Sequence, residues 1–192
     1  MKNNLNLFIF KVSFYILIIF EGALAQSFQF EAEIIETNDD NYIVASNNVV
    51  IEDVFGAKIF GDKVILDKLN KIYTISGNVT YEDKANLIII NADKIIYNDI
   101  NKIINTEGPA TLEKNNLYKI QSFDIEYNLI EKRISSNKKT TIKDNLKNKI
   151  LIKNLNISLN DNLLIAKNVE LIDKDLNIYT IKNIYYDFQK KK

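Results

Sequence analysis

Cysteine, histidine and tryptophan are absent from this chain of 192 residues, and proline occurs once. Without Cys and His the chain has no disulfide, no zinc site of the usual kind, no Cys or Ser–His nucleophile and no histidine proton shuttle. These absences exclude most hydrolytic, redox and metal chemistry. We therefore expect no enzyme activity, no catalytic residue, no cofactor and no metal site.

Positive charge carried by arginine is also nearly missing, because Arg133 is the only arginine and lysine supplies the other 24 positive charges. The 25 basic residues are balanced by 25 acidic ones, so the formal net charge is zero. Proteins that bind nucleic acid usually carry a basic surplus with prominent arginines. The composition therefore argues against nucleic acid as a partner.

The residues that are abundant favour β-structure. The chain holds 33 Ile, 27 Asn and 24 Lys, three residue types with A/T-rich codons, and its hydrophobic fraction is 46%. An AT-rich genome accounts for this bias, so the number of Asn residues does not indicate binding through Asn. The β-branched Ile residues nevertheless favour strands over helices.

The N-terminus has the three parts of an export signal. A polar start carrying Lys2 and Lys11 precedes an apolar run of nine residues, 12–20, which is shorter than the roughly 20 residues of a spanning helix. The tripeptide Ala-Leu-Ala that follows has the small-x-small pattern of a signal peptidase site. We expect cleavage between Ala25 and Gln26.

The alternative for this segment is a retained single-pass anchor over residues 5–24. With a cleaved signal peptide over 1–25, the mature chain is a single domain over 26–192. A domain of this length buries roughly 70% of the surface of its unfolded chain and needs no disulfide to hold a core.

A unit of about thirty residues repeats along the mature chain. Its first half has the form "apolar, x, small, Asp, x, apolar, x, apolar, Asp or Asn" at 59–67 and 90–98, and it returns in a looser form at 120–128, 152–160 and 181–188, with offsets of 31, 30, 32 and 29. A second half follows the same rhythm at 47–52, 77–82, 108–113, 138–143 and 167–172.

Side chains within these segments alternate with a period of two residues. Tyr73, Ile75, Val79 and Tyr81 fall on one face, which is typical of a half-buried strand. Sets of Asp and Asn, such as 67–70, 98–101 and 160–162, can cap the turns between strands. The pattern predicts an all-β architecture of roughly a dozen strands of 5–8 residues, and no helix after the signal.

The repeat motifs resemble the OstA-like domain of lipopolysaccharide-transport proteins. The resemblance is carried by Gly61-Asp62-Lys63-Val64, by residues 76–83 and by residues 92–98, with Phe-Gln-Phe-Glu-Ala near the mature start. It covers nearly all of the mature chain. In detail it is similar to the N-terminal periplasmic domain of the outer-membrane assembly protein (LptD type) and to the free-standing periplasmic bridge protein (LptA type).

The resemblance implies a β-jellyroll of stacked antiparallel strands with an apolar groove that shields the lipid A acyl chains of lipopolysaccharide. It also implies edge-to-edge pairing with other jellyroll components of the transport bridge, possible self-association, and a place in the periplasm associated with the outer membrane. The assembly protein continues into a large C-terminal barrel, so a stand-alone bridge and a separate or truncated N-terminal domain are both left open.

The repeat register places one apolar row on the interior of the jellyroll. Either ordinary core packing or contact with lipid explains these residues, and the sequence does not separate the two. The predicted lipid-binding groove consists of Val49, Ile51, Val79, Tyr81, Ile95, Tyr97, Ala110, Leu112, Ile125 and Tyr127.

Two sets of charged residues each have a functional interpretation and a simpler structural one. Asp62 and Asp93 could form a carboxylate pair or a cation site, but their separation favours turn residues at the starts of strands. Lys132-Arg133 with Lys138-Lys139 could face phosphorylated sugars, whereas a solvated turn face is the simpler reading.

Two functions outside transport fit the same repeats. The first is a structural β-solenoid that self-associates into filaments without carrying lipid. The second is a carbohydrate-active β-solenoid enzyme, which no clustered acid pair in the sequence supports.

Overall fold

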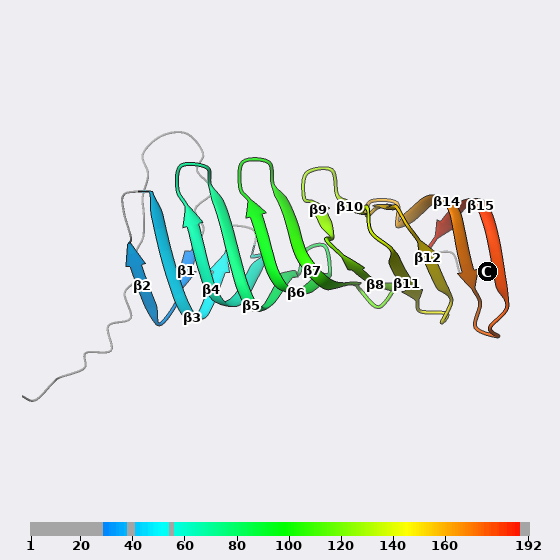
Figure 1. Ribbon diagram of the computed structural model, residues 1–192, viewed down its shortest axis with the longest axis horizontal. Coiled ribbons are helices and arrows are strands. Elements are labelled where there is room, and N and C mark those ends of the chain that lie inside the picture. Colours follow the sequence, from blue (N-terminus) through cyan, green and yellow to red (C-terminus); the bar gives the residue numbers. More distant parts are fainter. Residues whose placement is uncertain (1–28, 38–40, 54–55, 189–192) are drawn as a thin grey trace, which may run out of the picture.

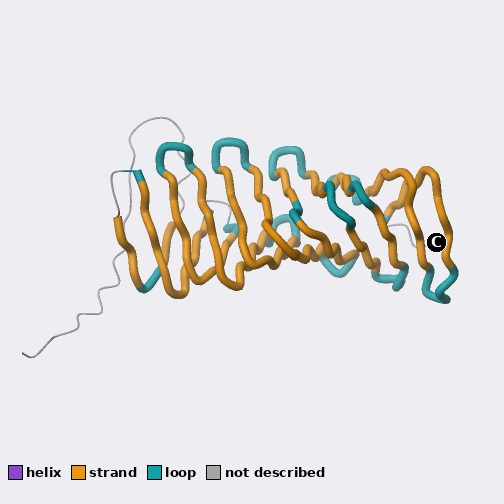
Figure 2. The backbone as a smooth tube through the Cα atoms, viewed as in Figure 1, coloured by secondary structure: helices purple, strands orange, loops and turns teal. Residues whose placement is uncertain are grey.

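A computed structural model describes residues 29–37, 41–53 and 56–188. The predicted signal peptide and its cleavage site, Ala25 and Gln26, lie outside these residues. All regular structure in the described part is β-strand, as Figure 2 shows, so the all-β prediction is confirmed. Among the described residues, no helix is long and apolar enough to span a membrane.

Within the described residues, fifteen strands follow one another. They are β1 (Gln29–Glu31), β2 (Ile34–Thr37), β3 (Tyr42–Glu52), β4 (Lys58–Asp67), β5 (Ile72–Asp83), β6 (Ile88–Asn98), β7 (Ile103–Lys114), β8 (Tyr118–Phe123), β9 (Glu126–Asn128), β10 (Arg133–Ser136), β11 (Thr140–Asp144), β12 (Lys149–Ile152), β13 (Leu155–Ser158), β14 (Leu163–Ile172) and β15 (Ile178–Asp187). All pairings between them are antiparallel.

The long strands β3 to β7 each bend in the middle. Their registers shift between Ser46 and Val49, between Phe60 and Lys63, between Ser76 and Val79, and between Ala92 and Lys94. A bulge of this kind kinks a strand and increases its twist. We call this line of bends the corner, and Figure 1 shows the long strands turning back along it at the lower edge of the view.

Residues that tolerate left-handed backbone occupy the corner. Gly77 and Gly108 have φ angles of 82° and 83°, and the Asn and Asp residues Asn78, Asp124 and Asn168 have φ angles of 48°, 58° and 52°. Asn and Asp enter this region more readily than other non-glycine residues. The corner is therefore encoded by Gly, Asn and Asp in the middle of each strand.

In the second half of the chain, several strands end at the corner and a new strand begins beyond it. β7 pairs through its second half with β8 and through its first half with β9, so β8 and β9 act as one strand broken at the corner. β14 likewise pairs with β13 and with β12 along its two halves. The broken strands continue the pattern of the bent ones.

The bends fold the sheet into a roll of two layers joined at the corner. The first layer contains the strand halves 42–46, 63–67, 72–76, 94–98 and 103–107 together with β2, β9, β10 and β13. The second layer contains the other halves together with β1, β8, β11 and β12. Side chains that point between the layers form one apolar core along the roll.

One detail of the sequence-based strand prediction is wrong. Several strands have 10 to 12 residues rather than 5 to 8, because the chain passes through the corner without a turn. The predicted turns are confirmed at Asp67, whose Oδ1 accepts the Asn70 N–H at 3.0 Å, and at Asn98, whose Oδ1 accepts the Asn101 N–H at 3.0 Å.

Candidate functional site

The ten residues predicted to line the groove all lie between the two layers. Each is buried, and the exposed fraction of none exceeds 5%. They come from both layers; for example Val79 pairs with Ala92 in the second layer, and Ile95 pairs with Ile75 in the first. The ten side chains therefore point into the interior as predicted, while their contact with lipid stays a prediction.

Opposite the corner, the ends of the two layers meet along a line of turns that we call the seam. It is formed by turns 67–72, 98–103 and 128–133 of the first layer, with turns 83–88 and 114–118 of the second. Figure 1 shows the turns of the first layer in a row along the upper edge of the view. The seam is the open side of the roll in the sense that no strand connects the layers there.

Tyrosines point from the core toward the seam, where their hydroxyl groups reach aspartates of the turns. The Tyr97 hydroxyl donates to Asp99 Oδ1 at 3.0 Å, and the hydroxyls of Tyr81 and Tyr127 each donate to Asp83 Oδ2 at 3.4 Å. The rings of Tyr81 and Tyr127 pack edge to face at 6.2 Å across the two layers. Each tyrosine therefore places its ring in the core and its hydroxyl at the polar rim.

These hydroxyl groups remain neutral at physiological pH. Burial first, and then the negative charge of Asp83, raises the pKa of Tyr81 and of Tyr127 well above the usual value for tyrosine. Burial and Asp99 raise the pKa of Tyr97 in the same way. The inner wall of the seam is consequently uncharged, and charge begins at the turns.

One polar cluster ties the layers together near the middle of the seam. Asp83 is buried at 6% exposure and accepts the Asn86 backbone N–H at 2.8 Å and the Asn86 Nδ2 at 2.6 Å. Lys132, from the β9–β10 turn of the opposite layer, donates to Asn86 Oδ1 at 2.6 Å. Lys114 donates to the Asn86 carbonyl oxygen, and burial lowers the pKa of Lys114.

A second tie closes the seam near the C-terminal end. Tyr186 of β15 donates its hydroxyl hydrogen to Asp144, the last residue of β11, and Asn148 Nδ2 donates to the same hydroxyl at 3.0 Å. The rings of Tyr118 and Phe188 lie 4.2 Å apart. Hydrogen bonds from a few turn residues thus hold the two layers together at the seam.

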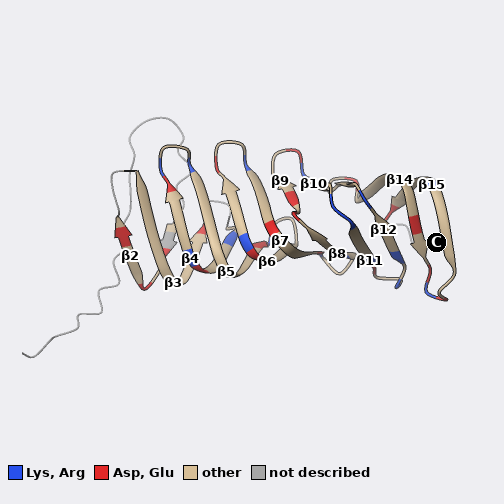
Figure 3. Ribbon diagram, viewed as in Figure 1, with Lys and Arg blue, Asp and Glu red and all other residues tan. Residues whose placement is uncertain are grey.

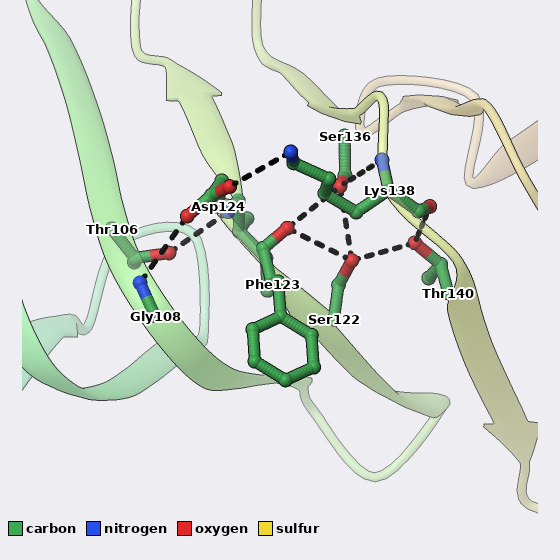
Figure 4. A network of polar contacts seen from close by, with 9 residues as sticks. Thr106, Gly108, Ser122, Phe123, Asp124, Ser136, Lys138 and Thr140 are labelled. Atoms are coloured by element: carbon green, nitrogen blue, oxygen red, sulfur yellow. Dashed lines mark hydrogen bonds and ion pairs between the residues drawn. The ribbon is translucent and has the colours of Figure 1, made fainter.

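Buried hydroxyl groups bridge the broken strands at the corner, as Figure 4 shows. Ser122 Oγ lies 2.9 Å from Ser136 Oγ and 2.7 Å from Thr140 Oγ1. The Thr106 hydroxyl accepts the Ile125 N–H at 2.8 Å. These hydroxyls satisfy the polar groups that the interruption of β8/β9 and β10/β11 leaves at the corner.

The apolar interior reaches both ends of the roll. At the N-terminal end β2 pairs with β3 alone, and its Ile34 and Ile35 are 45% and 41% exposed. At the C-terminal end β15 pairs with β14 alone, and its Ile178 and Tyr179 are 66% and 47% exposed. Each end therefore presents a strand edge without a partner strand in the described part of the chain, together with apolar side chains.

The two aspartates singled out in the sequence do not lie where they were predicted. Asp62 and Asp93 lie at the corner in the middle of β4 and β6, so their assignment to the starts of strands is wrong. Asp62 Oδ2 accepts the Asn78 Nδ2 at 3.4 Å, a contact between neighbouring bends. Within the part of the chain that the structure describes, no three Asp or Glu side chains gather as a metal site.

The lysine cluster of the sequence is divided between opposite edges of the roll. Lys132 lies at the seam, and Arg133 forms an ion pair with Glu131 at 2.8 Å. Lys138 lies at the corner, 3.7 Å from Asp124. In Figure 3 basic and acidic segments are interspersed along strands and turns, and no stripe of one sign is visible on this view.

Sequence reasoning missed the cluster around Asp83 and Asn86. The only signal was the recurrence of Asp or Asn two residues after a tyrosine, as in Tyr81-Glu82-Asp83 and Tyr97-Asn98-Asp99. The partner Lys132 is 46 residues away in the chain, so sequence spacing gave no indication of the contact.

Comparison with known proteins gave matches among solved structures. No protein-family model matches the chain, and no curated protein matches it in sequence. Among solved structures, the chain is similar to LptH, the LptA homologous periplasmic component of the lipopolysaccharide transport device of Pseudomonas aeruginosa. The identity is 12%, the match covers 84% of this chain and 94% of that one, and the TM-score is 0.31.

Proposed function

We propose that this chain is a periplasmic carrier of lipopolysaccharide that works in association with the outer membrane. It shields the acyl chains between its two layers and joins edge to edge with other β-jellyroll components of a transport bridge. The observation that carries the proposal is the continuous apolar interior that ends at an exposed strand edge on both sides of the roll.

An apolar interior meets the main physical demand of such transport. Exposing acyl chains to water costs roughly 25 cal/mol for each Å² of apolar surface. The interior rows consist almost wholly of Ile, Leu, Val, Ala and Tyr. Transport of this kind needs binding and release without covalent chemistry, in agreement with a chain that lacks Cys and His.

The seam is the proposed route of entry. At the corner the long strands run from one layer into the other, whereas at the seam side-chain and turn contacts such as Lys132 to Asn86 and Tyr186 to Asp144 join the layers. Acyl chains would enter as these contacts part and would replace side-chain contacts in the core. The tyrosine hydroxyls then lie where acyl chain meets sugar, a position that suits a side chain with an apolar ring and a polar tip.

A cross-linked seam tests this route. The chain contains no Cys, so Asn86→Cys with Lys132→Cys introduces a single pair that a short bismaleimide can join. We expect the wild-type protein to bind purified lipopolysaccharide in a co-sedimentation assay and the cross-linked variant to bind much less. The matched control is the same double variant without cross-linker, which should bind like wild type.

Two outcomes contradict the proposal in different ways. If wild-type protein binds no lipopolysaccharide, the carrier function is wrong. If the cross-linked variant binds as much lipopolysaccharide as the untreated double variant, the lipid does not enter at this seam.

The end strand β15 is the proposed joining edge, and a charge placed on it tests this. Ile178→Lys introduces a charge on a residue that is 66% exposed at the edge, and Ile130→Lys introduces the same charge on a turn residue that is 69% exposed. Charged side chains on an edge strand oppose pairing with another strand. In sedimentation velocity we expect the first variant to weaken association and the second to leave it unchanged; equal effects would contradict the assignment.

Structural filament formation is the competing function, and sedimentation also separates it from transport. Filaments that lengthen with protein concentration and are unaffected by added lipopolysaccharide would support the structural role. Association of discrete size that changes with lipopolysaccharide supports the carrier.

A further inference from the structure

A concave region lies on the outer face of the second layer, beside the corner and away from the seam. Its volume is about 900 Å³, within the usual range of ligand sites. Strands β5, β6, β7, β8 and β11 form its floor, and the loop of Lys138 and Lys139 borders it. We call this region the outer groove. The interior proposed to hold acyl chains lies on the opposite face of the same strands.

Five polar side chains form an aligned row across the floor of the outer groove. Backbone pairing places Thr80 beside Asn91, Asn91 beside Thr111, Thr111 beside Gln121, and Gln121 beside Thr141. With strands about 4.8 Å apart, the row spans about 19 Å. Within the row, Thr80 Oγ1 donates to Asn91 Oδ1 at 3.0 Å. The Thr80 oxygen can still accept, the Asn91 amide N–H groups can still donate, and the side chains of Thr111, Gln121 and Thr141 can do both.

An exposed aromatic ring lies at the border of this row. Phe123 is 55% exposed and lines the outer groove. Its carbonyl oxygen accepts the hydroxyls of Ser122 at 3.2 Å and Ser136 at 3.0 Å, both of which are buried, as Figure 4 shows. The buried hydroxyl network of the corner therefore anchors the backbone of an exposed phenylalanine.

The charges of the outer groove cancel. Lys138 and Lys139 are balanced by Asp93 and Asp124, and Lys138 lies 3.7 Å from Asp124. A nucleic acid or a polyphosphate needs a surplus of positive charge, which the lining lacks. A protein partner usually meets an apolar centre, whereas the centre here is a row of Thr, Asn and Gln.

We propose that the outer groove binds an extended, mostly uncharged oligosaccharide. Its hydroxyl groups pair with the row from Thr80 to Thr141, and the apolar face of a sugar ring packs on Phe123. This inference goes beyond lipid transport, because the outer groove and the interior lie on opposite faces of the second layer. The glycan can belong to a lipopolysaccharide molecule or to a separate polysaccharide, and both present the same hydroxyl-rich chain.

Titration with two lipid-free saccharides tests the proposal. The probes are the N-acetylglucosamine tetramer and the core oligosaccharide released from lipopolysaccharide by mild acid hydrolysis, each followed by calorimetry and by amide NMR shifts of the full chain. We expect at least one probe to shift the amides of Thr111 and Gln121. Binding of the core oligosaccharide alone identifies the lipopolysaccharide glycan as the source, and binding of the tetramer identifies a separate polysaccharide.

Three variants complete the test. Phe123→Ala should weaken binding by about tenfold or more, and Thr111→Val, which removes a hydroxyl at nearly constant shape, should weaken it in the same direction. Tyr185→Ala is the control, because Tyr185 is 75% exposed on β15, away from the outer groove. All three should retain the wild-type melting curve and should still co-sediment through the interior with lipid A freed of its core oligosaccharide.

The proposal is overturned if neither saccharide binds wild-type protein. It is also overturned if Phe123→Ala and Thr111→Val both bind like wild type. Loss of saccharide binding with retained lipopolysaccharide binding would confirm that the outer groove and the interior are independent sites. If the wild-type protein binds a saccharide but does not bind the lipid, the carrier function is refuted and the outer groove proposal stands.

Discussion

The two corner glycines Gly77 and Gly108 permit a matched test of what sets the bend. Their φ angles are 82° and 83°, so alanine suffers the same backbone penalty at both positions. A Cβ on Gly108 meets nothing within 4 Å, whereas a Cβ on Gly77 would lie 2.7 Å from Asp62 Cβ and 2.2 Å from Asp62 Oδ2. The two substitutions therefore differ chiefly by one steric contact between neighbouring bends.

The expected losses of stability follow from these contacts. Left-handed backbone costs an L-residue about 1–2 kcal/mol, which is the whole expected effect of Gly108→Ala. Overpacking adds about 1–3 kcal/mol, and a change of the Asp62 rotamer cannot relieve it because Asp62 Cβ is fixed to the backbone. We therefore expect Gly77→Ala to reduce the free energy of unfolding by about 2–5 kcal/mol.

Urea unfolding followed by circular dichroism measures both variants. Asp62→Gly, combined with Gly77→Ala, removes the clashing side chain and should recover part of the loss, which a double-mutant cycle detects as coupling. If Gly77→Ala and Gly108→Ala lower the stability equally, to within about 0.5 kcal/mol, the contact between Asp62 and its neighbouring bend is absent and the reasoning fails.

Three further predictions concern the interior, the corner and the seam. Leu112→Ala, at a fully buried position, should destabilise by about 2–5 kcal/mol in urea, while Ile89→Ala, on the neighbouring strand at 42% exposure, should change stability by no more than about 0.5 kcal/mol; equal losses would contradict the assigned faces. Ser122→Ala should cost about 1–3 kcal/mol, because it leaves buried hydroxyls unpaired, and an unchanged urea midpoint would show that the network contributes nothing. Burial raises the pKa of Tyr186 from 10.0 to about 12, so the native state keeps this proton after the unfolded chain has released it, and the stability present below about pH 10 should fall toward pH 12. Tyr186→Phe should make this fall shallower in urea titrations at increasing pH, and an identical slope would refute the contribution of Tyr186.

The repeat and its alternation predicted the faces of the strands correctly. Val79, Tyr81, Ile95 and Tyr97 were assigned to the interior from the period of two residues, and all are buried. This prediction succeeds because successive side chains alternate between the two faces of a strand, so the direction of each depends only on its position along the strand. The capping of turns by Asp67 and Asn98 was predictable for the same reason, since it involves residues within one turn.

The corner and the outer groove were not predictable from the residues alone. Asn78, Asp124 and Asn168 adopt left-handed backbone in the middle of strands, but in a chain with 27 Asn these positions do not stand out. The outer groove depends on how the bends curve the second layer, and the row from Thr80 to Thr141 reads as an ordinary polar face until five strands are aligned. Both features arise from contacts between residues far apart in the sequence.

The pairing of the roll has a consequence for how the chain folds. Each strand, bent or broken, pairs mainly with the strand that precedes it and the one that follows it, as in β3 to β7. Most strand pairings therefore join neighbours along the chain, and folding can begin at one hairpin and spread by adding one strand at a time. A chain that is synthesised from its N-terminus can fold in the same order, and each completed hairpin then offers its free edge as the template for the next.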